Sequence, residues 1–226
     1  MKETNHEHEH EFEAAHGLPE QLPADERVLW QGSPDAWAMA RDVFHVRSLT
    51  VYFGVILALR AGTAWSNNGT AYDGVMAALL LLPLAVFALA ALGMLAWLSS
   101  RTTVYTLTNK RVVMRIGIVL TLTFNLPYRT VAAAGLRARK DGTGDIPLQL
   151  LASEKIAFVH LWPHTRPWRV ASPEPMLRCL PNVAAVAQTL SGAWQQATGQ
   201  TLGAGRHIAT APSHAPVHSP STLSPT

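Results

Sequence analysis

The sequence has few of the residues and motifs on which enzymes depend. Its single cysteine, Cys179, cannot form an internal disulfide, which suits a cytoplasmic location. Because it lies beside Leu177 and Leu180, this cysteine is predicted to be a small buried hydrophobic side chain and not a reactive thiol. There is also no Gly-rich phosphate loop, no serine nucleophile elbow and no CxxC pair. We therefore expect a protein that is not an enzyme, has no cofactor and does not bind nucleic acid.

Charge is absent from a long internal stretch, Val75 to Leu98. A helix over these residues reaches about 36 Å, enough to cross a hydrocarbon core of about 30 Å. Pro83 predicts a kink within the span, and Trp97 suits an interfacial anchor. Residues 75–98 are therefore predicted to form a transmembrane helix.

An earlier apolar run over residues 49–66 predicts another transmembrane helix, interrupted only by Arg60 and threonines. Arg60 either extends toward the membrane interface or contacts a partner, with Asp73 as the nearest acidic candidate. The intervening residues 67–74 contain no Lys or Arg, whereas cations flank both spans on the other side. The positive-inside rule then places both termini in the cytoplasm, with 67–74 as an external loop.

Both ends of the chain are low in apolar residues. The leader, residues 1–17, is acidic and His-rich and has no signal-peptide core, so it is expected to be disordered. His6, His8 and His10 lie in the repeat HEHEHEFE, for which the alternative is loose metal binding. Residues 18–48 form a cytoplasmic N-terminal segment, and the Pro/Ser/Thr-rich tail, residues 200–226, is expected to be disordered.

Residues 100–199 carry the pattern of a soluble α+β domain. Apolar alternation and turn signals predict strands at 102–108, 111–117, 118–124, 130–140, 145–151 and 155–162. Asn182 then begins an amphipathic helix that ends before Gly199. The pattern alone predicts a small antiparallel barrel or curved sheet with a C-terminal helix.

This domain is basic, with twelve Lys or Arg against four Asp or Glu over residues 101–178. Such an excess favours anionic lipids or an acidic partner surface, although a solvated face with positive-inside charge explains part of it. The candidate partner-binding cations Arg137, Arg139 and Lys140 lead into a turn containing Gly142 and Gly144. The two glycines serve turn geometry first, and the flanking Asp141 and Asp145 would repel a phosphate.

A second candidate interface is the segment from Trp162 to Arg169, in which Trp162 and Trp168 alternate with prolines, Arg166 and Arg169. Such a stiff amphipathic loop is typical of interfaces, but both tryptophans could instead seal the barrel against its helix. His164 is a further partner candidate, and His160 and His164 could bind pigment or metal or be ordinary turn histidines.

Several segments resemble a known family. LPADERVLWQGSP and YTLTNKRVVMRIG resemble the bacterial pleckstrin-homology-like membrane protein family. FHVR, NLPYRTV, KDGTGDIPLQL and LWPHTRPWRVASPEPMLRCLP are similar to a group of photosynthetic-complex assembly proteins of purple phototrophic bacteria. The resemblance covers residues 18–199. It implies a pleckstrin-homology-like domain on an assembly factor or scaffold in the bacterial inner membrane, with reaction-centre or core-antenna subunits as partners. Independently of the resemblance, small residues in the two spans allow close helix approach and self-association; these are Gly54, Ala58, Gly62, Ala91 and Gly93. The alternative is a lipid- or small-ligand-binding module.

Overall fold

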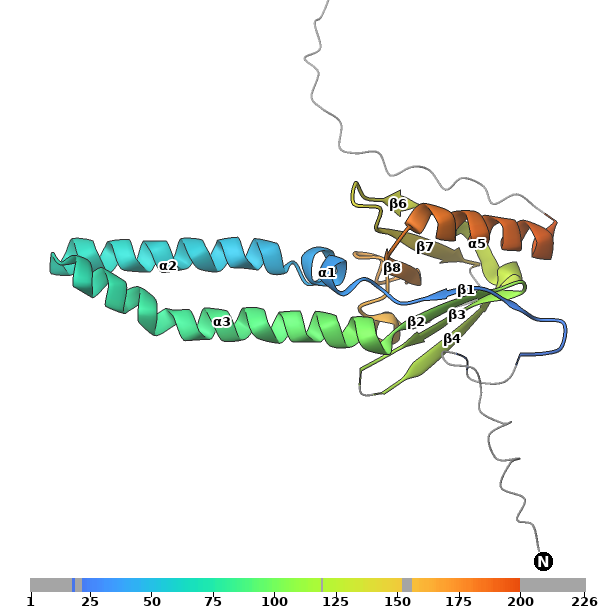
Figure 1. Cartoon of the computed structure of the whole chain (residues 1–226), viewed down its shortest axis with the longest axis horizontal. Helices are drawn as coiled ribbons and strands as arrows, with labels where there is room; N and C mark the ends of the chain where they lie inside the picture. The colour runs from blue at the N-terminus through green and yellow to red at the C-terminus, as the bar shows by residue number, and fades with distance from the viewer. Residues whose placement is uncertain (1–17, 19–21, 119, 152–155, 200–226) are drawn as a thin grey trace, which may run out of the picture.

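A helical hairpin projects from a domain made of sheets and one long C-terminal helix (Figure 1). The computed structural model describes residues 18, 22–118, 120–151 and 156–199. Helices α2 (Val46–Asn68) and α3 (Ala71–Thr102) form the hairpin. Both are long and apolar enough to cross a membrane, judged by length and composition. Helix α3 bends in its N-terminal half and contains Pro83, which removes a helical hydrogen bond (Figure 1).

The first sheet has the strand order β1-β2-β3-β4 and is antiparallel throughout. Its strands are β1 (Val28–Gly32), β2 (Val104–Thr108), β3 (Arg111–Ile116) and β4 (Leu122–Pro127). Strand β1 precedes the helical hairpin in the chain and pairs with β2 from the other side of it. The domain therefore includes part of the N-terminal segment, which the predicted boundary at residue 100 left out.

The second sheet is built around β7 (Gly144–Leu150), which pairs with three other strands. These are β5 (Val131–Ala134), β6 (Arg137–Ala138) and β8 (Met176–Leu180). A short 3-10 turn, η3 (Tyr128–Thr130), links the sheets, and α4 (Phe158–Leu161) precedes β8. Helix α5 (Val183–Thr198) lies along the domain as its last element (Figure 1).

The main core lies between the sheets and α5. Tyr105, Leu107 and Met114 from the first sheet meet Leu148 and Leu177 from the second. Helix α5 is amphipathic, as predicted, and contributes these buried residues to the core: Val183, Val186, Leu190, Ala193 and Trp194.

Trp194 joins the helix to both sheets. Its indole Nε1 donates to the carbonyl oxygens of Tyr128 at 3.1 Å and Val131 at 3.3 Å. Trp162 and Trp168 are exposed, so the alternative in which these two tryptophans seal the barrel is wrong.

Three local predictions are corrected by the structure. The segment 155–162 is not a strand, because its described part forms the short helix α4, Phe158–Leu161. The strand predicted from Ile118 begins at Leu122, after a tight turn at Gly117 with φ 126°. Asn182 precedes α5 as predicted, but its φ of 49° leaves its side chain without a capping bond. Strand β8, in the Pro-rich passage, was not predicted.

The N-terminal segment is tied to the β2–β3 turn. Glu26 pairs with Arg111 at 2.7 Å, and Asp25 pairs with Lys110. The Asn109 side chain donates to the Asp25 carbonyl at 3.0 Å. The segments LPADER and TNKR, both of which carried the family resemblance, are therefore contact partners in the fold.

The helical hairpin is joined to the sheets at two places. Only Thr103 separates α3 from β2. On the other side, the short helices α1 (Ala36–Ala38) and η2 (Met39–Val43) lead into α2. They pack with α3 and β8 in a small buried cluster made of Ala38, Met39, Phe44, Ala96 and Cys179. These contacts fix the direction of the hairpin relative to the sheets.

Candidate functional site

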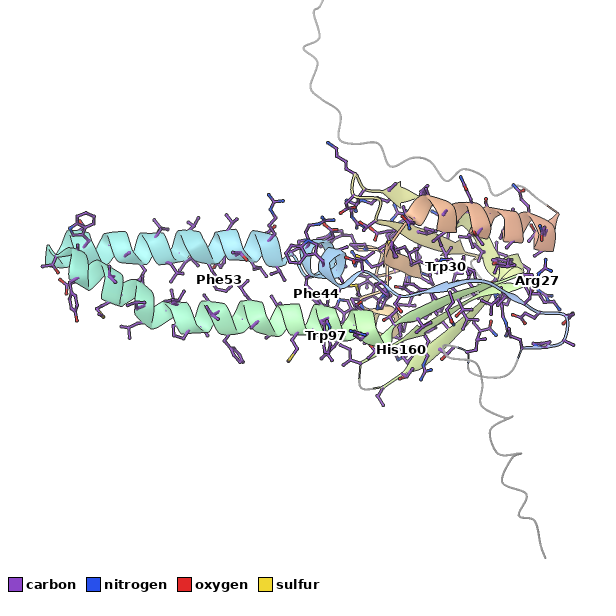
Figure 2. The ribbon with its side chains drawn as sticks, in the orientation of Figure 1. Arg27, Trp30, Phe44, Phe53, Trp97 and His160 are labelled. Carbon is purple, nitrogen blue, oxygen red and sulfur yellow. The ribbon has the colours of Figure 1, made fainter. Side chains whose placement is uncertain are left out.

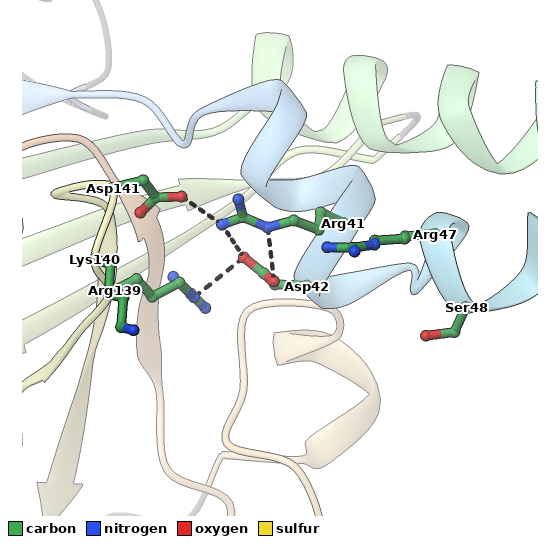
Figure 3. A pocket seen from close by; sticks show the side chains of 7 residues that line it. All are labelled: Arg41, Asp42, Arg47, Ser48, Arg139, Lys140 and Asp141. Atoms are coloured by element: carbon green, nitrogen blue, oxygen red, sulfur yellow. Dashed lines mark hydrogen bonds and ion pairs between the residues drawn. The ribbon is translucent and has the colours of Figure 1, made fainter.

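A charged pocket lies where the β6–β7 turn meets η2 and the first turn of α2 (Figure 3). Its volume is about 510 Å³. The lining residues are Arg41, Asp42, Arg47, Ser48, Arg139, Lys140 and Asp141. The site therefore combines residues at and just before the start of the helical hairpin with residues that follow the hairpin in the sequence.

The inner wall is a network of ion pairs. Arg41 binds Asp42 through both Nε and Nη2, at 3.0 and 2.9 Å, and reaches Asp141 at 2.6 Å. Arg139 binds the same Asp42 at 3.1 Å and Asp145 at 2.6 Å. These five side chains hold the β6–β7 turn against η2.

Asp145 is the most buried member of the network, at 1% exposure. Its second carboxylate oxygen accepts from the Cys179 backbone N–H at 2.9 Å. Asp141 is exposed, and hydrogen bonds from Thr143, then the Arg41 guanidinium, hold its carboxyl pKa well below the usual range. The Asp141 carboxylate therefore stays ionised at neutral pH.

The outer wall of the pocket carries two cations that do not belong to this network. Arg47 and Lys140 are exposed, and neither forms an ion pair or side-chain hydrogen bond within the residues that the structure describes. Figure 3 shows Arg47 extending from α2 toward Arg41. The basic run predicted as one surface is thus divided: Arg139 points into the network, whereas Arg137 and Lys140 are exposed.

The glycines of the β6–β7 turn serve geometry, as predicted. Gly142 has φ 79°, and its carbonyl oxygen accepts from the Val183 N–H at 3.1 Å, at the start of α5. A Cβ on Gly144 would lie 2.5 Å from the Arg137 carbonyl oxygen and 2.6 Å from Val183 Cγ1. Glycine is required there because strand and helix approach so closely.

His164 is not available to a partner, which corrects the prediction made for it. It is 1% exposed and lies against the start of β2. Its Nδ1 lies 2.6 Å from the Tyr105 hydroxyl and its Nε2 lies 3.1 Å from the Thr103 hydroxyl. Burial, and then the nearby Arg178 charge, lowers the pKa of His164 to about 3. The imidazole is therefore a neutral structural group.

The tryptophans of the same segment do lie at the surface. Trp168 is 98% exposed, and Trp162 is 55% exposed with its ring edge against Phe44 at 6.1 Å between centroids. Arg166 and Arg169 are both held by Glu174, at 2.8 and 3.6 Å. The segment thus presents aromatic surface, while its charges are partly satisfied internally.

Arg60 lies exposed on α2, away from the pocket. Its suggested pairing with Asp73 is not formed, because Asp73 bonds with Thr70 at the start of α3. Gly54, Gly62 and Gly93 have open space where a Cβ would lie, so they do not mediate the contact between α2 and α3. That contact instead uses Gly74, whose Cβ would lie 2.8 Å from the Ala61 carbonyl oxygen.

The described part of the chain offers little basis for metal binding or for thiol chemistry. No three His, Cys, Asp or Glu side chains gather there as a metal site. His6, His8 and His10 lie outside the described residues. Burial raises the pKa of the Cys179 thiol to about 12, in agreement with its prediction as a small buried hydrophobe.

Sequence reasoning missed the pocket although it used some of its residues. Arg41 and Arg47 are among the flanking cations from which the orientation of the two spans was predicted, and Asp42 carried no signal. Arg41 and Asp141 are separated by 100 positions, so no local spacing brings them together. The available signal was the density of charge immediately before the first apolar run.

Comparison with known proteins agrees with this architecture. A family model described as Bacterial PH domain matches residues 51–194. The chain is 36% identical over 190 residues to a Rhodobacter capsulatus protein described as an uncharacterized 23.7 kDa protein in the puhA 5′ region, an alignment covering 84% of this chain and 89% of that protein. A pleckstrin-homology-domain protein of the duf1696 family from Shewanella loihica is similar over 41% of this chain and 71% of its own, with 13% identity and a TM-score of 0.28, too slight a likeness to add to the argument. On the family match and the relative, this chain belongs to the bacterial PH domain family.

Proposed function

We propose that the protein is a membrane-anchored, non-enzymatic assembly factor for the photosynthetic reaction centre and its core antenna in purple bacteria. The observation that carries this proposal is the relative from the puhA 5′ region, which aligns along almost the whole chain, both long helices included. The segments similar to the PuhB assembly proteins support the same role. The family match points to a binding module rather than to an enzyme.

The fold suits a scaffold that acts at a fixed height above the membrane. The single residue between α3 and β2, together with the packing of α1 and η2 on α3, prevents the domain from moving on a tether. Exposed aromatic surface at Trp162 and Trp168 offers contacts of the kind enriched at protein interfaces. The protein could thus contact a client both within the bilayer and at the membrane surface.

The proposed topology has the domain in the cytoplasm and the α2–α3 turn outside. The native Cys179 is buried, so it gives little background in cysteine labelling. A cysteine at Asn67 should react with an impermeant maleimide added to whole cells, whereas one at Gln195 on α5 should react only after lysis. The opposite pattern would invert the topology.

Assembly is tested by deleting the gene in its phototrophic host. We expect a several-fold loss of assembled reaction centre, measured by near-infrared absorbance of membranes, and full recovery with the wild-type gene. Trp168→Ala should recover less, because it removes exposed aromatic surface without touching the core. Trp37→Ala, which removes a tryptophan that is 74% exposed on α1, is the matched control.

Normal amounts and normal kinetics of reaction-centre formation in the deletion strain would refute the assembly role. Equal recovery by all variants would instead keep the role and remove Trp168 from the contact surface. Co-purification of reaction-centre or core-antenna subunits with the full chain identifies which client is bound.

A further inference from the structure

We propose that the charged pocket at the foot of the helical hairpin binds the phosphate group of an anionic phospholipid. This inference rests on the membrane location in the proposed function, but not on the identity of any client. The pocket is separate from the exposed Trp168 to which the assembly contact was assigned.

The pocket lies at the level where a lipid head group would be. Arg47 and Ser48 line it from the first turn of α2, immediately before the apolar run that begins at Leu49. Val46 of the same turn packs against the small buried cluster to which Ala96 of α3 belongs. The adjacent Trp97 is 50% exposed, with the Arg101 guanidinium 5.7 Å from its ring centroid. A tryptophan and cations at one end of an apolar helix mark the interfacial region of a bilayer.

The charges of the pocket favour an anion despite its aspartates. Four cations line it against two carboxylates, those of Asp42 and Asp141. Both carboxylates are already engaged: Asp42 accepts from two arginines, and Asp141 accepts from Arg41 and Thr143. The repulsion expected from Asp141 is therefore largely compensated, and Asp145 is buried behind Arg139. Arg47 and Lys140 remain to meet an incoming phosphate.

The start of α2 adds further donors. The first intrahelical bond recorded there runs from the Leu49 N–H to the His45 carbonyl oxygen. The N–H groups of the three preceding residues therefore begin the helix without a partner four residues back. Such a helix start favours a phosphate when cations stand beside it.

The wall of the pocket continues into an apolar face on α2. Val51 and Val55 follow Arg47 at intervals of four residues, and Tyr52 follows Ser48 at the same interval. Residues at this spacing lie on one side of a helix. These side chains are 64%, 52% and 56% exposed, in the order Val51, Val55 and Tyr52. A ligand with its phosphate in the pocket would lay acyl chains along this face, which is why we commit to a lipid and not to free phosphate.

The test uses the full chain in a neutral detergent, titrated with phosphatidylglycerol, phosphatidylcholine or inorganic phosphate and followed by native mass spectrometry. We expect phosphatidylglycerol to bind more tightly than the other two. Replacing both free cations, as Arg47→Gln with Lys140→Gln, should weaken its binding by about 20- to 30-fold, or about 2 kcal/mol.

The matched control removes the same charge from the opposite end of the sheet, as Arg27→Gln with Arg129→Gln. Both residues are exposed, and Figure 2 shows Arg27 far from the helical hairpin. This control should bind phosphatidylglycerol like the wild type. Both double variants should unfold at the wild-type temperature in lipid-free detergent, because these cations hold no ion pairs in the described residues.

Three results would overturn the proposal. Equal losses in the two double variants would show attraction to net charge and not to a site. Wild-type affinity in Arg47→Gln with Lys140→Gln would exclude the pocket. Equal affinity for inorganic phosphate and phosphatidylglycerol would assign the pocket to a soluble anion. None of these results bears on reaction-centre assembly, so the two proposals fail separately.

Discussion

Asp145→Ala is expected to lower the free energy of unfolding by about 3–5 kcal/mol. Asp145 is almost fully buried and accepts from Arg139 at 2.6 Å and from the Cys179 N–H at 2.9 Å. Its removal leaves a largely buried guanidinium with only Asp42 and an orphaned backbone donor, and both are costly in a protein interior. Denaturant unfolding of the full chain in detergent, followed by tryptophan fluorescence, measures the loss.

Two further variants test whether the loss of stability comes from breaking the buried ion pair or from removing a charge anywhere. Asp145→Asn keeps an oxygen for the Cys179 N–H but loses the charge, so its stability should lie between wild type and Asp145→Ala. Asp25→Ala removes the exposed partner of Lys110 and should change stability little, because water screens that pair. If Asp145→Ala were as stable as Asp25→Ala, the network would not hold the β6–β7 turn in place.

The second large effect is a loss of stability on acidification, caused by His164. The folded protein keeps this imidazole neutral, with its pKa lowered from 6.5 to about 3. The unfolded chain binds a proton near pH 6.5 and the folded chain does not, so stability falls as the pH is lowered from about 6.5 toward 3. The slope approaches about 1.4 kcal/mol per pH unit. Between pH 6.5 and pH 4.5, we expect a loss of about 2–3 kcal/mol.

His164→Gln should remove most of that slope, since glutamine does not titrate. His160→Gln is the matched control, because His160 is exposed on α4 four residues earlier and should leave the slope unchanged. The comparison is confined to pH above 4.5, where carboxyl groups contribute least. A wild-type slope in His164→Gln would show that other groups cause the acid sensitivity.

The helices could be predicted from sequence because their signals are local. A charge-free run of 24 residues and a stripe at Val183, Val186, Leu190 and Trp194 each specify a helix without reference to the rest of the chain. Strand β1 has no such signal, because it is five residues long, mostly exposed and paired with β2 across the whole helical hairpin. Strand β8 lies between prolines, and α4 is a single turn that begins with Phe158 and Val159, two residue types that favour strands.

The candidate site, too, could be predicted from the sequence only in part. The composition predicted a basic surface near the membrane, and the Asp141–Gly144 turn was located correctly. Which cations are free depends on pairings between distant residues, such as Arg41 with Asp141 and Arg139 with Asp42. His164 could not be recognised as buried, because Thr103 and Tyr105, which bind it, lie about 60 positions earlier. Contacts of this kind follow from the fold and not from spacing.

The direct passage of α3 into β2 makes the helical hairpin a lever. Helix α3 has 32 residues and is about 48 Å long, and it enters the sheet after Thr103 alone. A force applied at the α2–α3 turn would therefore be transmitted as torque to the sheets instead of being absorbed by a flexible joint. In the proposed setting, a client that tilts the hairpin on one side of the bilayer rotates the domain on the other. A pair of spectroscopic labels, at Asn67 and on α5, would move as a single rigid body.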